Sequence, residues 1–214
     1  MPDTDKSNSQ NHGEFVEREM SEAEWHIKNA TTDVTQFMRP VADGETVGDA
    51  TVYTPDGQSM ALSSLWADKP ALIVTGSMTC PPSRRLNPAT TAISGQFADR
   101  VQVAVLYVID AHPSGDRCPY TGTDWTTQTN RDENILIRQP RDQAERCERA
   151  REYRELLGLD STVVVDGMEN SAWAALGKSP NMAILIGTDG VCLICQDWFR
   201  PDHLTEFLSD KLAT

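Results

Sequence analysis

The residue with the clearest capacity for chemistry is Cys80, in the run Thr-Cys-Pro-Pro. The apolar run 71–74 before it is typical of a buried strand that ends at Gly76, and the two prolines after it suit the first turn of a helix. Cys80 therefore falls on a strand-to-helix turn, where free N–H groups and the helix dipole lower the pKa of a thiol. Arg84 and Arg85 add positive charge nearby. We predict a reactive thiolate; the alternative is a small buried hydrophobe.

His112 is the best partner for this thiol. It follows the apolar run 101–109, which predicts a second strand buried on both faces. Ligands of open α/β sheets bind beyond the carboxyl ends of the strands, so parallel pairing of the two strands would bring Cys80 and His112 to one edge. An imidazole titrates in the range that proton transfer to or from a thiol requires. The alternative for His112 is a capping or surface role.

Four further residues are candidates for binding or orienting a substrate. Asp110 lies two residues before the histidine, where it could orient the imidazole or bind a polar substrate group. Ser77 and Thr79 could hydrogen-bond the sulfur or a substrate oxygen, and ordinary turn hydrogen bonding explains them equally well. Pro180 precedes another predicted strand; a cis peptide there is a minority outcome, at about 5–6% of X–Pro bonds.

The other four cysteines are candidates to react with an oxidised Cys80. Cys118 is the best candidate for a resolving thiol, because a long polar insert can carry it to the site. Cys147 falls on the apolar face of a predicted helix and is expected in the core. Cys192 and Cys195 have the spacing of a zinc half-site or redox pair, but residues three apart on a regular strand point to opposite faces. No second pair completes four ligands, so we predict packing roles and no metal site.

The order of predicted elements indicates an α/β fold with a mixed central sheet. The elements are a β-hairpin (50–62), the two strands and intervening helix around Cys80, an irregular insert (113–139), a helix (141–157), a strand (162–166), a short helix (169–176), a second hairpin (181–195) and a last helix (201–212). Pro88 predicts a kink near Asn87. In the helix 141–157 the arginines alternate with glutamates, which predicts a solvated, ion-paired face made by Arg146, Arg149, Arg151 and Arg154.

Length and composition indicate one globular domain with an extension. Of 214 residues, 39% are hydrophobic and 24% are charged. We expect a flexible, partly helical extension over residues 1–40 and one domain over residues 41–214. The net charge of −13 argues against nucleic acid and anionic membrane as partners. Five scattered cysteines and no apolar leader predict a cytoplasmic protein, with a homodimer as one candidate assembly.

Three runs resemble the iodothyronine deiodinase family. Residues 77–82, Ser-Met-Thr-Cys-Pro-Pro, resemble its active-site run, in which a selenocysteine followed by two prolines stands in the place of Cys80. Residues 107–112, Tyr-Val-Ile-Asp-Ala-His, resemble its segment with an acidic residue two before an essential histidine. Residues 163–170 are similar to its valine-valine-aspartate strand-helix junction. The resemblance runs in order from about Val47 to Leu212.

The resemblance implies a thioredoxin-like, peroxiredoxin-related fold with a deiodinase-type insertion. It places Pro180 where thioredoxin-like proteins carry a cis proline. It implies that the sulfur of Cys80 attacks the iodine of an iodinated phenol while His112 binds or protonates the phenol, with Asp110 in the place of a glutamate. External thiols would then reduce the sulfenyl halide, and no other cofactor is implied.

Departures from the family pattern leave the substrate open. Met78 stands where many members carry an auxiliary cysteine, Pro140 where they often have a second histidine, and Met182 where an arginine contacts the substrate. One alternative is a thiol peroxidase, although Ile73 breaks the peroxiredoxin signature. The other is a thioredoxin-fold binding module that uses the insert 113–139 as its interaction surface.

Overall fold

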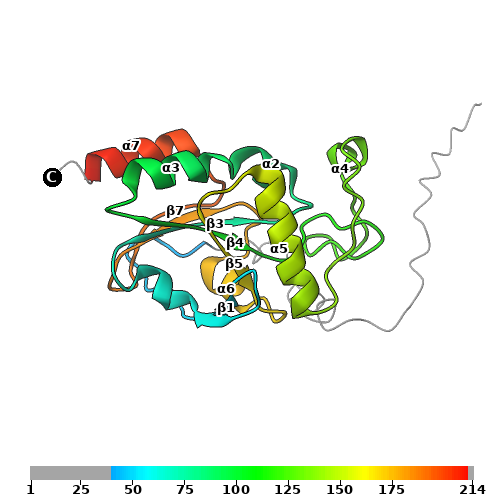
Figure 1. Ribbon diagram of the computed structural model, residues 1–214, viewed down its shortest axis with the longest axis horizontal. Coiled ribbons are helices and arrows are strands. Elements are labelled where there is room, and N and C mark those ends of the chain that lie inside the picture. The colour runs from blue at the N-terminus through cyan, green and yellow to red at the C-terminus, as the bar shows by residue number, and fades with distance from the viewer. Residues whose placement is uncertain (1–39, 212–214) are drawn as a thin grey trace, which may run out of the picture.

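The computed structural model describes residues 40–211, so the predicted extension and its helix lie outside the described residues. Within them, a seven-stranded mixed sheet has the order β2-β1-β5-β4-β3-β6-β7 (Figure 1). Its strands are β1 (Thr51–Tyr53), β2 (Ser59–Ala61), β3 (Ala71–Gly76), β4 (Gln102–Tyr107), β5 (Thr162–Asp166), β6 (Ala183–Ile186) and β7 (Cys192–Gln196).

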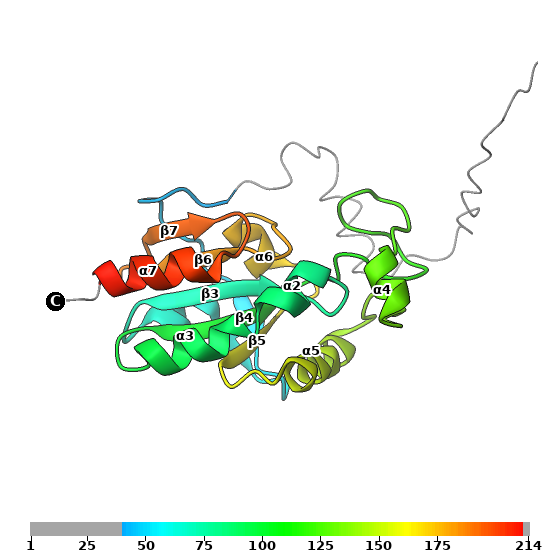
Figure 2. The ribbon, with the colours of Figure 1, turned by 90° about the horizontal axis from the view of Figure 1, so that it is seen from above.

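Helices cover both faces of this sheet. The helices are η2 (Leu62–Trp66), α2 (Pro81–Leu86), α3 (Ala89–Phe97), α4 (Gln128–Asp132), α5 (Gln143–Leu157), α6 (Ser171–Leu176) and α7 (Pro201–Lys211). Two core clusters, one with α3 and α7 and one with α5, lie on one face, and a third with η2 and α6 lies on the other. Figures 1 and 2 show α3 beside α7 on one side of the sheet and α6 on the other. The predicted α/β fold with a mixed central sheet is confirmed.

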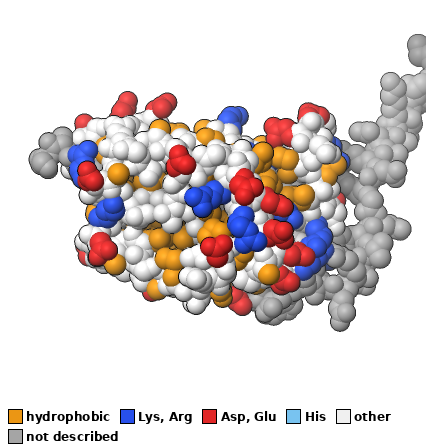
Figure 3. Space-filling view, viewed as in Figure 1, with side chains coloured by type: hydrophobic (Ala, Val, Ile, Leu, Met, Phe, Trp, Pro, Cys, Tyr) orange, Lys and Arg blue, Asp and Glu red, His pale blue; other side chains and the backbone are white. Residues whose placement is uncertain are grey.

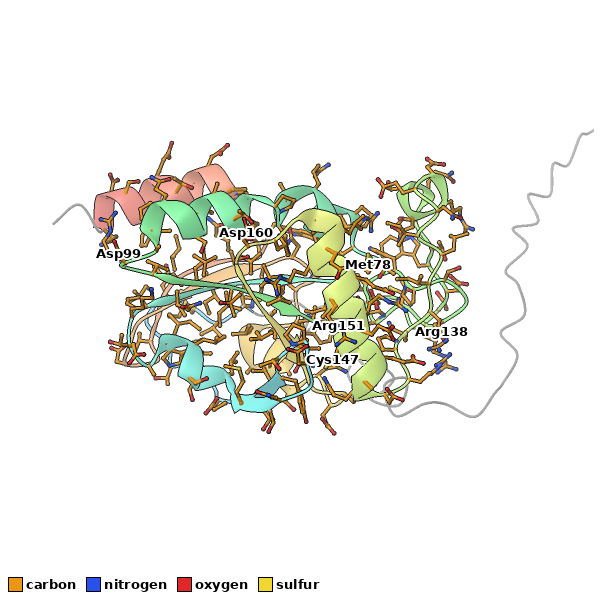
Figure 4. The ribbon with its side chains drawn as sticks, viewed as in Figure 1. Met78, Asp99, Arg138, Cys147, Arg151 and Asp160 are labelled. Atoms are coloured by element: carbon orange, nitrogen blue, oxygen red, sulfur yellow. The ribbon has the colours of Figure 1, made fainter. Side chains whose placement is uncertain are left out.

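The centre of the sheet is the parallel pair β3 and β4. All six residues of β3 are buried, as its unbroken apolar pattern predicts. The two strands pair in register from Ala71 opposite Gln102 to Gly76 opposite Tyr107, so they end at the same edge. Strand β6 runs antiparallel on the other side of β3. Figure 4 marks the two ends of the sheet: Asp99 precedes β4 at one end, and Met78 follows β3 at the other.

The predicted kink near Asn87 is a break between two helices. Helix α2 ends at Leu86, where the Asn87 N–H donates to the Ser83 carbonyl, and α3 restarts at Ala89 after Pro88. Pro88 cannot donate to the helical ladder, which accounts for the break. Helix α5 begins after Asp142, whose carboxylate accepts the Glu145 N–H at 2.9 Å, and ends at Gly158 with φ +59°.

Arg151 and Arg154 are exposed, as predicted for the solvated face of α5, whereas Arg149 has only 16% of its side chain exposed and the prediction is wrong for Arg146. Acidic and basic side chains intersperse over the side of the molecule that carries α5, and Arg149 pairs with Glu152 (Figure 3). Arg146 instead is fully buried, and its Nη1 donates to the Gly167 carbonyl at 2.5 Å and to Asn170 Oδ1 at 2.9 Å. Charge alternation fails here because the helix turns this position toward the backbone of the β5–α6 junction.

Two further expectations are wrong. The Ser179–Pro180 peptide is trans, since residues 40–211 contain no cis peptide bond. The Ser179 carbonyl accepts from Thr75 Oγ1 and Trp173 Nε1. Cys192 and Cys195 do not point to opposite faces, because β7 carries a register shift against β6.

No helix among residues 40–211 has the length and apolar character to cross a bilayer.

Gly76, the last residue of β3, is required by close packing. A Cβ added there would overlap Asn87 Nδ2 and lie 2.7 Å from the Tyr153 hydroxyl. We expect Gly76→Ala to destabilise the protein by about 1–3 kcal/mol, because this rigid interior cannot absorb a methyl group. Urea unfolding measures the change. The control Gly95→Ala meets no atom within 4 Å in α3 and should stabilise by roughly 0.5–1 kcal/mol. Equal midpoints for Gly76→Ala and the wild type would contradict this packing constraint.

Candidate active site

The turn that carries Cys80 and the turn that carries His112 are joined at the carboxyl edge of the sheet. The His112 N–H donates to Thr79 Oγ1 at 3.0 Å, and the Ala111 N–H donates to Ser77 Oγ at 3.3 Å. Both hydroxyl residues are fully buried. Parallel pairing of β3 and β4 therefore brings the two predicted turns together, and Ser77 and Thr79 lie between them as bridging groups.

The carboxylate of Asp110 holds the two turns in place by accepting several hydrogen bonds. Its fully buried carboxylate accepts from the Thr79 N–H and Oγ1 (both 3.1 Å) and from the Tyr107 hydroxyl (3.1 and 3.2 Å). The Tyr107 hydroxyl also accepts the Met78 N–H at 3.2 Å. Burial raises the pKa of Asp110, and the charge of Arg149 opposes that shift. Asp110 thus orients the cysteine turn; its carboxylate does not hydrogen-bond the imidazole, which was one of its two predicted roles.

Cys80 is the N-cap residue of α2, as predicted, but its thiol is buried, with 1% of the residue exposed. Burial raises the pKa of Cys80, and hydrogen bonds with Ser83 and the charge of Arg84 act in the opposite direction. The predicted low-pKa thiolate is therefore wrong for this conformation. The sequence places the sulfur at a helix terminus but does not reveal that neighbouring side chains cover it.

Arg84 is the predicted positive charge beside Cys80, whereas Arg85 is exposed. The Arg84 guanidinium donates to the Met78 carbonyl at 2.5 Å and to Asn130 Oδ1 at 2.9 Å, and pairs with Glu133 at 2.6 Å. These contacts hold the charge next to the turn. Its charge favours the thiolate of Cys80 in addition to the hydrogen bonds with Ser83.

His112 is half-buried beside an aromatic cluster. Its ring makes an edge contact with Trp125 at a centroid distance of 4.4 Å, and Tyr120 lies 6.5 Å away. Burial lowers the pKa of His112, so the imidazole is neutral at neutral pH. Nδ1 is buried and has no hydrogen-bond partner. When the proton of the neutral ring is on Nε2, Nδ1 is a free acceptor.

No hydrogen bond joins the Cys80 and His112 side chains among residues 40–211. The two residues are connected through their turns, and the charge of Arg84 affects the pKa of both groups. Pro180 contacts the site through its backbone carbonyl, which accepts a hydrogen bond from the Ser83 hydroxyl at 3.2 Å.

The insert after His112 is anchored to the site. Asn130 Nδ2 donates to the Thr79 carbonyl at 2.9 Å and to the His112 carbonyl at 3.3 Å. Gln139 binds the Asp110 backbone on both sides, accepting from its N–H at 3.1 Å and donating to its carbonyl at 2.7 Å. Sequence reasoning missed Asn130, Gln139 and Trp125. The two amides bond to residues distant in the chain, so no local sequence pattern distinguishes them from the other polar residues of the insert.

Cys147 and Cys118 are both buried but lie in different surroundings. Cys147 packs in the core with Tyr153, as predicted. Cys118 is buried, and burial raises the pKa of its thiol. The Tyr120 N–H donates to its sulfur at 3.3 Å. Burial raises the pKa of Tyr120, and the charges of Cys80 and Cys118 act in the same direction. Among the described residues, no three His, Cys, Asp or Glu side chains are placed to hold a metal ion.

The fold and this cysteine turn define a thioredoxin-like protein. The chain is similar to the thioredoxin domain of a thiol-disulfide oxidoreductase from Bacteroides vulgatus, with a TM-score of 0.57 and 13% identity over 81% of this chain and 99% of that one. It is also similar to a thioredoxin family thiol:disulfide interchange protein from Chlorobium tepidum, with a TM-score of 0.51 and 14% identity over 80% and 99% of the two chains. At these identities the likeness shows the fold alone.

The chain belongs to the iodothyronine deiodinase family, whose model matches residues 5–193. It is 26% identical to type II iodothyronine deiodinase of Rattus norvegicus over 148 residues, which are 68% of this chain and 50% of that protein. It is 24% identical to the Homo sapiens enzyme of the same name over 129 residues, 59% and 41% of the two chains. The chain thus spans about half the length of the curated relatives it matches. Family and fold together support a thiol-dependent redox function.

The ionisation of Cys80 can be measured directly. We expect its alkylation rate to reach half its maximum at a higher pH than that of a free thiol, because burial raises its pKa. Removing the charge in Arg84→Met should move this midpoint upward by roughly one pH unit, and Arg85→Met should leave it unchanged. Peptide-resolved mass spectrometry after iodoacetamide pulses gives the profile. The midpoint is the readout, since burial also slows access. A midpoint below that of glutathione would contradict the structure and restore the sequence prediction.

The buried carboxylate of Asp110 predicts a pH-dependent stability. The folded protein holds this proton more tightly than the unfolded chain, because the pKa of Asp110 is raised above 3.8. The stability of the wild type relative to Asp110→Asn should therefore be greatest below pH 3.8 and fall as pH rises through the raised pKa, by about 1.4 kcal/mol for each tenfold gain in proton affinity. Urea unfolding across this pH range measures the difference. The exposed Asp160 (Figure 4) provides the control Asp160→Asn. A difference that grows with pH would contradict the raised pKa.

Proposed function

We propose that this protein is a thiol-dependent oxidoreductase that reductively removes iodine from iodinated phenols, with Cys80 as the nucleophile. The observation that carries the proposal is the buried, unpartnered Nδ1 of His112, held beside the Cys80 turn by the Thr79 hydroxyl. A neutral imidazole with a free acceptor is suited to receive a phenolic hydroxyl.

The aromatic surroundings support a phenolic substrate. Trp125 is 47% exposed and its ring meets His112 edge-on, so a substrate ring that reaches Nδ1 also contacts the indole. Tyr120 continues this cluster to Trp173, with ring centroids 6.2 Å apart. Aromatic pairs in such geometries add about 0.5–1.5 kcal/mol beyond the burial of area.

The proposed reaction balances in two stages. The Cys80 sulfur loses its proton and attacks iodine; an S–I bond forms, the C–I bond breaks with its electron pair on carbon, and the carbon takes up a proton. Hydrogen bonding of the phenol to His112 raises electron density at that carbon. The substrate is thereby reduced and Cys80 is oxidised to a sulfenyl iodide. One external thiol then displaces iodide to give a mixed disulfide, and a second releases free Cys80 and an external disulfide.

The reducing partner is an external small-molecule thiol, and the sulfur must be uncovered for turnover. Cys80 is buried, and Asn130 of the insert donates a hydrogen bond to the Thr79 carbonyl in the same turn. Movement of the insert is therefore expected to accompany entry of substrate and thiol, as lids do in many enzymes. Exposure would also lower the pKa of Cys80, since burial is the main cause that raises it.

Iodide release tests the proposal. With iodotyrosine or an iodinated phenol and dithiothreitol, we expect release that is lost in Cys80→Ser and reduced about 10²–10⁴-fold in His112→Ala, the usual contribution of an acid–base residue. The controls are Cys147→Ser in the core and His203→Ala on the exposed face of α7, both expected to keep wild-type rates. Ion chromatography measures iodide.

A parallel peroxide assay separates the alternatives. Consumption of peroxide that needs Cys80, without iodide release, would overturn dehalogenation in favour of a thiol peroxidase. Absence of both activities, with Cys80 titrating as an ordinary cysteine, would favour a binding module that uses the insert.

A further inference from the structure

Strand β7 departs from regular geometry between its two cysteines. Ile184 of β6 lies opposite Cys195, and Ile186 lies opposite Cys192, with a register shift between them. Positions 184 and 186, which are two residues apart on β6, therefore pair with positions 195 and 192, which are three residues apart on β7. The additional residue is Leu193, which is 44% exposed, so the strand carries a β-bulge at this point.

The bulge places both cysteines on one face of the sheet. Cross-strand partners share a face, and Ile184 and Ile186 both belong to the core cluster under η2 and α6. Cys192 is buried in that cluster, and Cys195 packs against it. Ile194, between them, packs against the cluster on the opposite face. The sequence predicts packing roles because residues three apart on a regular strand point to opposite faces. In this bulged strand the two side chains lie on the same face, so that argument does not apply.

The two sulfurs interact directly. The interaction between the two side chains lowers the pKa of Cys192 and raises that of Cys195. A regular strand advances about 3.3 Å per residue, so three residues would separate the Cα atoms by roughly 10 Å. Matching the bulged segment to two residues of β6 reduces this to about 6.6 Å, within the roughly 4.4–6.8 Å that a disulfide spans.

An acidic side chain adjoins the pair. The segment 41–45 runs along β7, with the Gly44 N–H donating to the Cys192 carbonyl and the Cys192 N–H donating to the Glu45 carbonyl, both at 2.8 Å. Asp43 Oδ1 accepts the Cys195 N–H at 3.0 Å and lies 4.0 Å from the Cys192 sulfur. The carboxylate is an acceptor for a proton that leaves the thiols.

We propose that Cys192 and Cys195 form a second redox site, a dithiol that is reversibly oxidised to an intramolecular disulfide by small external disulfides. The site lies on edge strand β7, separated from β3 and its Cys80 turn by β6. It does not depend on the function proposed for Cys80.

The exchange balances without any further reactant. One deprotonated sulfur of the pair attacks an external disulfide, forms a mixed disulfide and releases one external thiolate. The neighbouring thiol loses its proton and attacks the protein sulfur of that mixed disulfide, which forms the Cys192–Cys195 bond and releases the second thiolate. The two protein thiols are oxidised, and the external disulfide is reduced to two thiols. Excess dithiol reductant reverses both steps.

The test uses the full chain equilibrated with oxidised glutathione, quenched in acid and alkylated. Trypsin does not cleave the Arg200–Pro201 bond, so residues 179–211 form one tryptic peptide that contains both cysteines. We expect this peptide to lack both alkyl groups and to be lighter by two hydrogen atoms than the dithiol form, with full return after dithiothreitol. Cys80→Ser and Cys147→Ser should form the bond as the wild type does. Cys192→Ser and Cys195→Ser should each stop at a glutathione adduct on the remaining cysteine.

Three results in the wild type would overturn the proposal, so the decision does not depend on whether the variants fold. These are full alkylation of both cysteines after equilibration, a stable glutathione adduct on one of them without the internal bond, and a disulfide that joins two chains. Non-reducing gel electrophoresis and the peptide masses distinguish all three results from the expected intramolecular disulfide.

Discussion

The structure of the candidate site depends on one buried carboxylate between two parallel strand ends. Pairing of β3 with β4 brings both turns to one edge, but the turns themselves lie beyond the ladder and need other partners. Asp110 supplies these partners by accepting from Thr79 and Tyr107 at once. A buried carboxylate without donors is strongly unfavourable, so its hydrogen bonds and the turn geometry require each other. Cys80 and His112 are positioned as a consequence.

The same packing determines the chemistry of the sulfur. Burial disfavours the thiolate of Cys80, whereas Ser83 and Arg84 favour it. Arg84 is itself held by the insert, through Asn130 and Glu133. In the function proposed above, a movement of the insert that exposes the thiol would remove the main cause that raises the pKa of Cys80. The insert would then control the reactivity of the sulfur.

The sequence predicts the parts of this arrangement that depend on local pattern. Unbroken apolar runs predict β3 and β4, and the proline pair predicts the helix that begins after Cys80. What it does not predict depends on contacts distant in the chain. Arg146 looks solvated because its neighbours are charged, yet its partners are backbone groups of the β5–α6 junction. The Ser179 carbonyl before Pro180 likewise accepts from donors on β3 and α6, which no local pattern specifies.

Both sulfur sites occur where the backbone leaves regular strand geometry. Cys80 lies just past the end of β3, and the Cys192–Cys195 pair flanks the bulge in β7. In a regular strand, alternation fixes each side chain to one face, and neighbouring strands occupy the N–H and C=O groups. A strand end or a bulge leaves some of these groups free and redirects side chains, which is what a thiol needs to meet a hydrogen-bond donor or a second thiol. The irregular positions of this sheet are therefore the places where its cysteines can acquire chemistry, whereas Cys147, on a regular helix face, remains a packing residue.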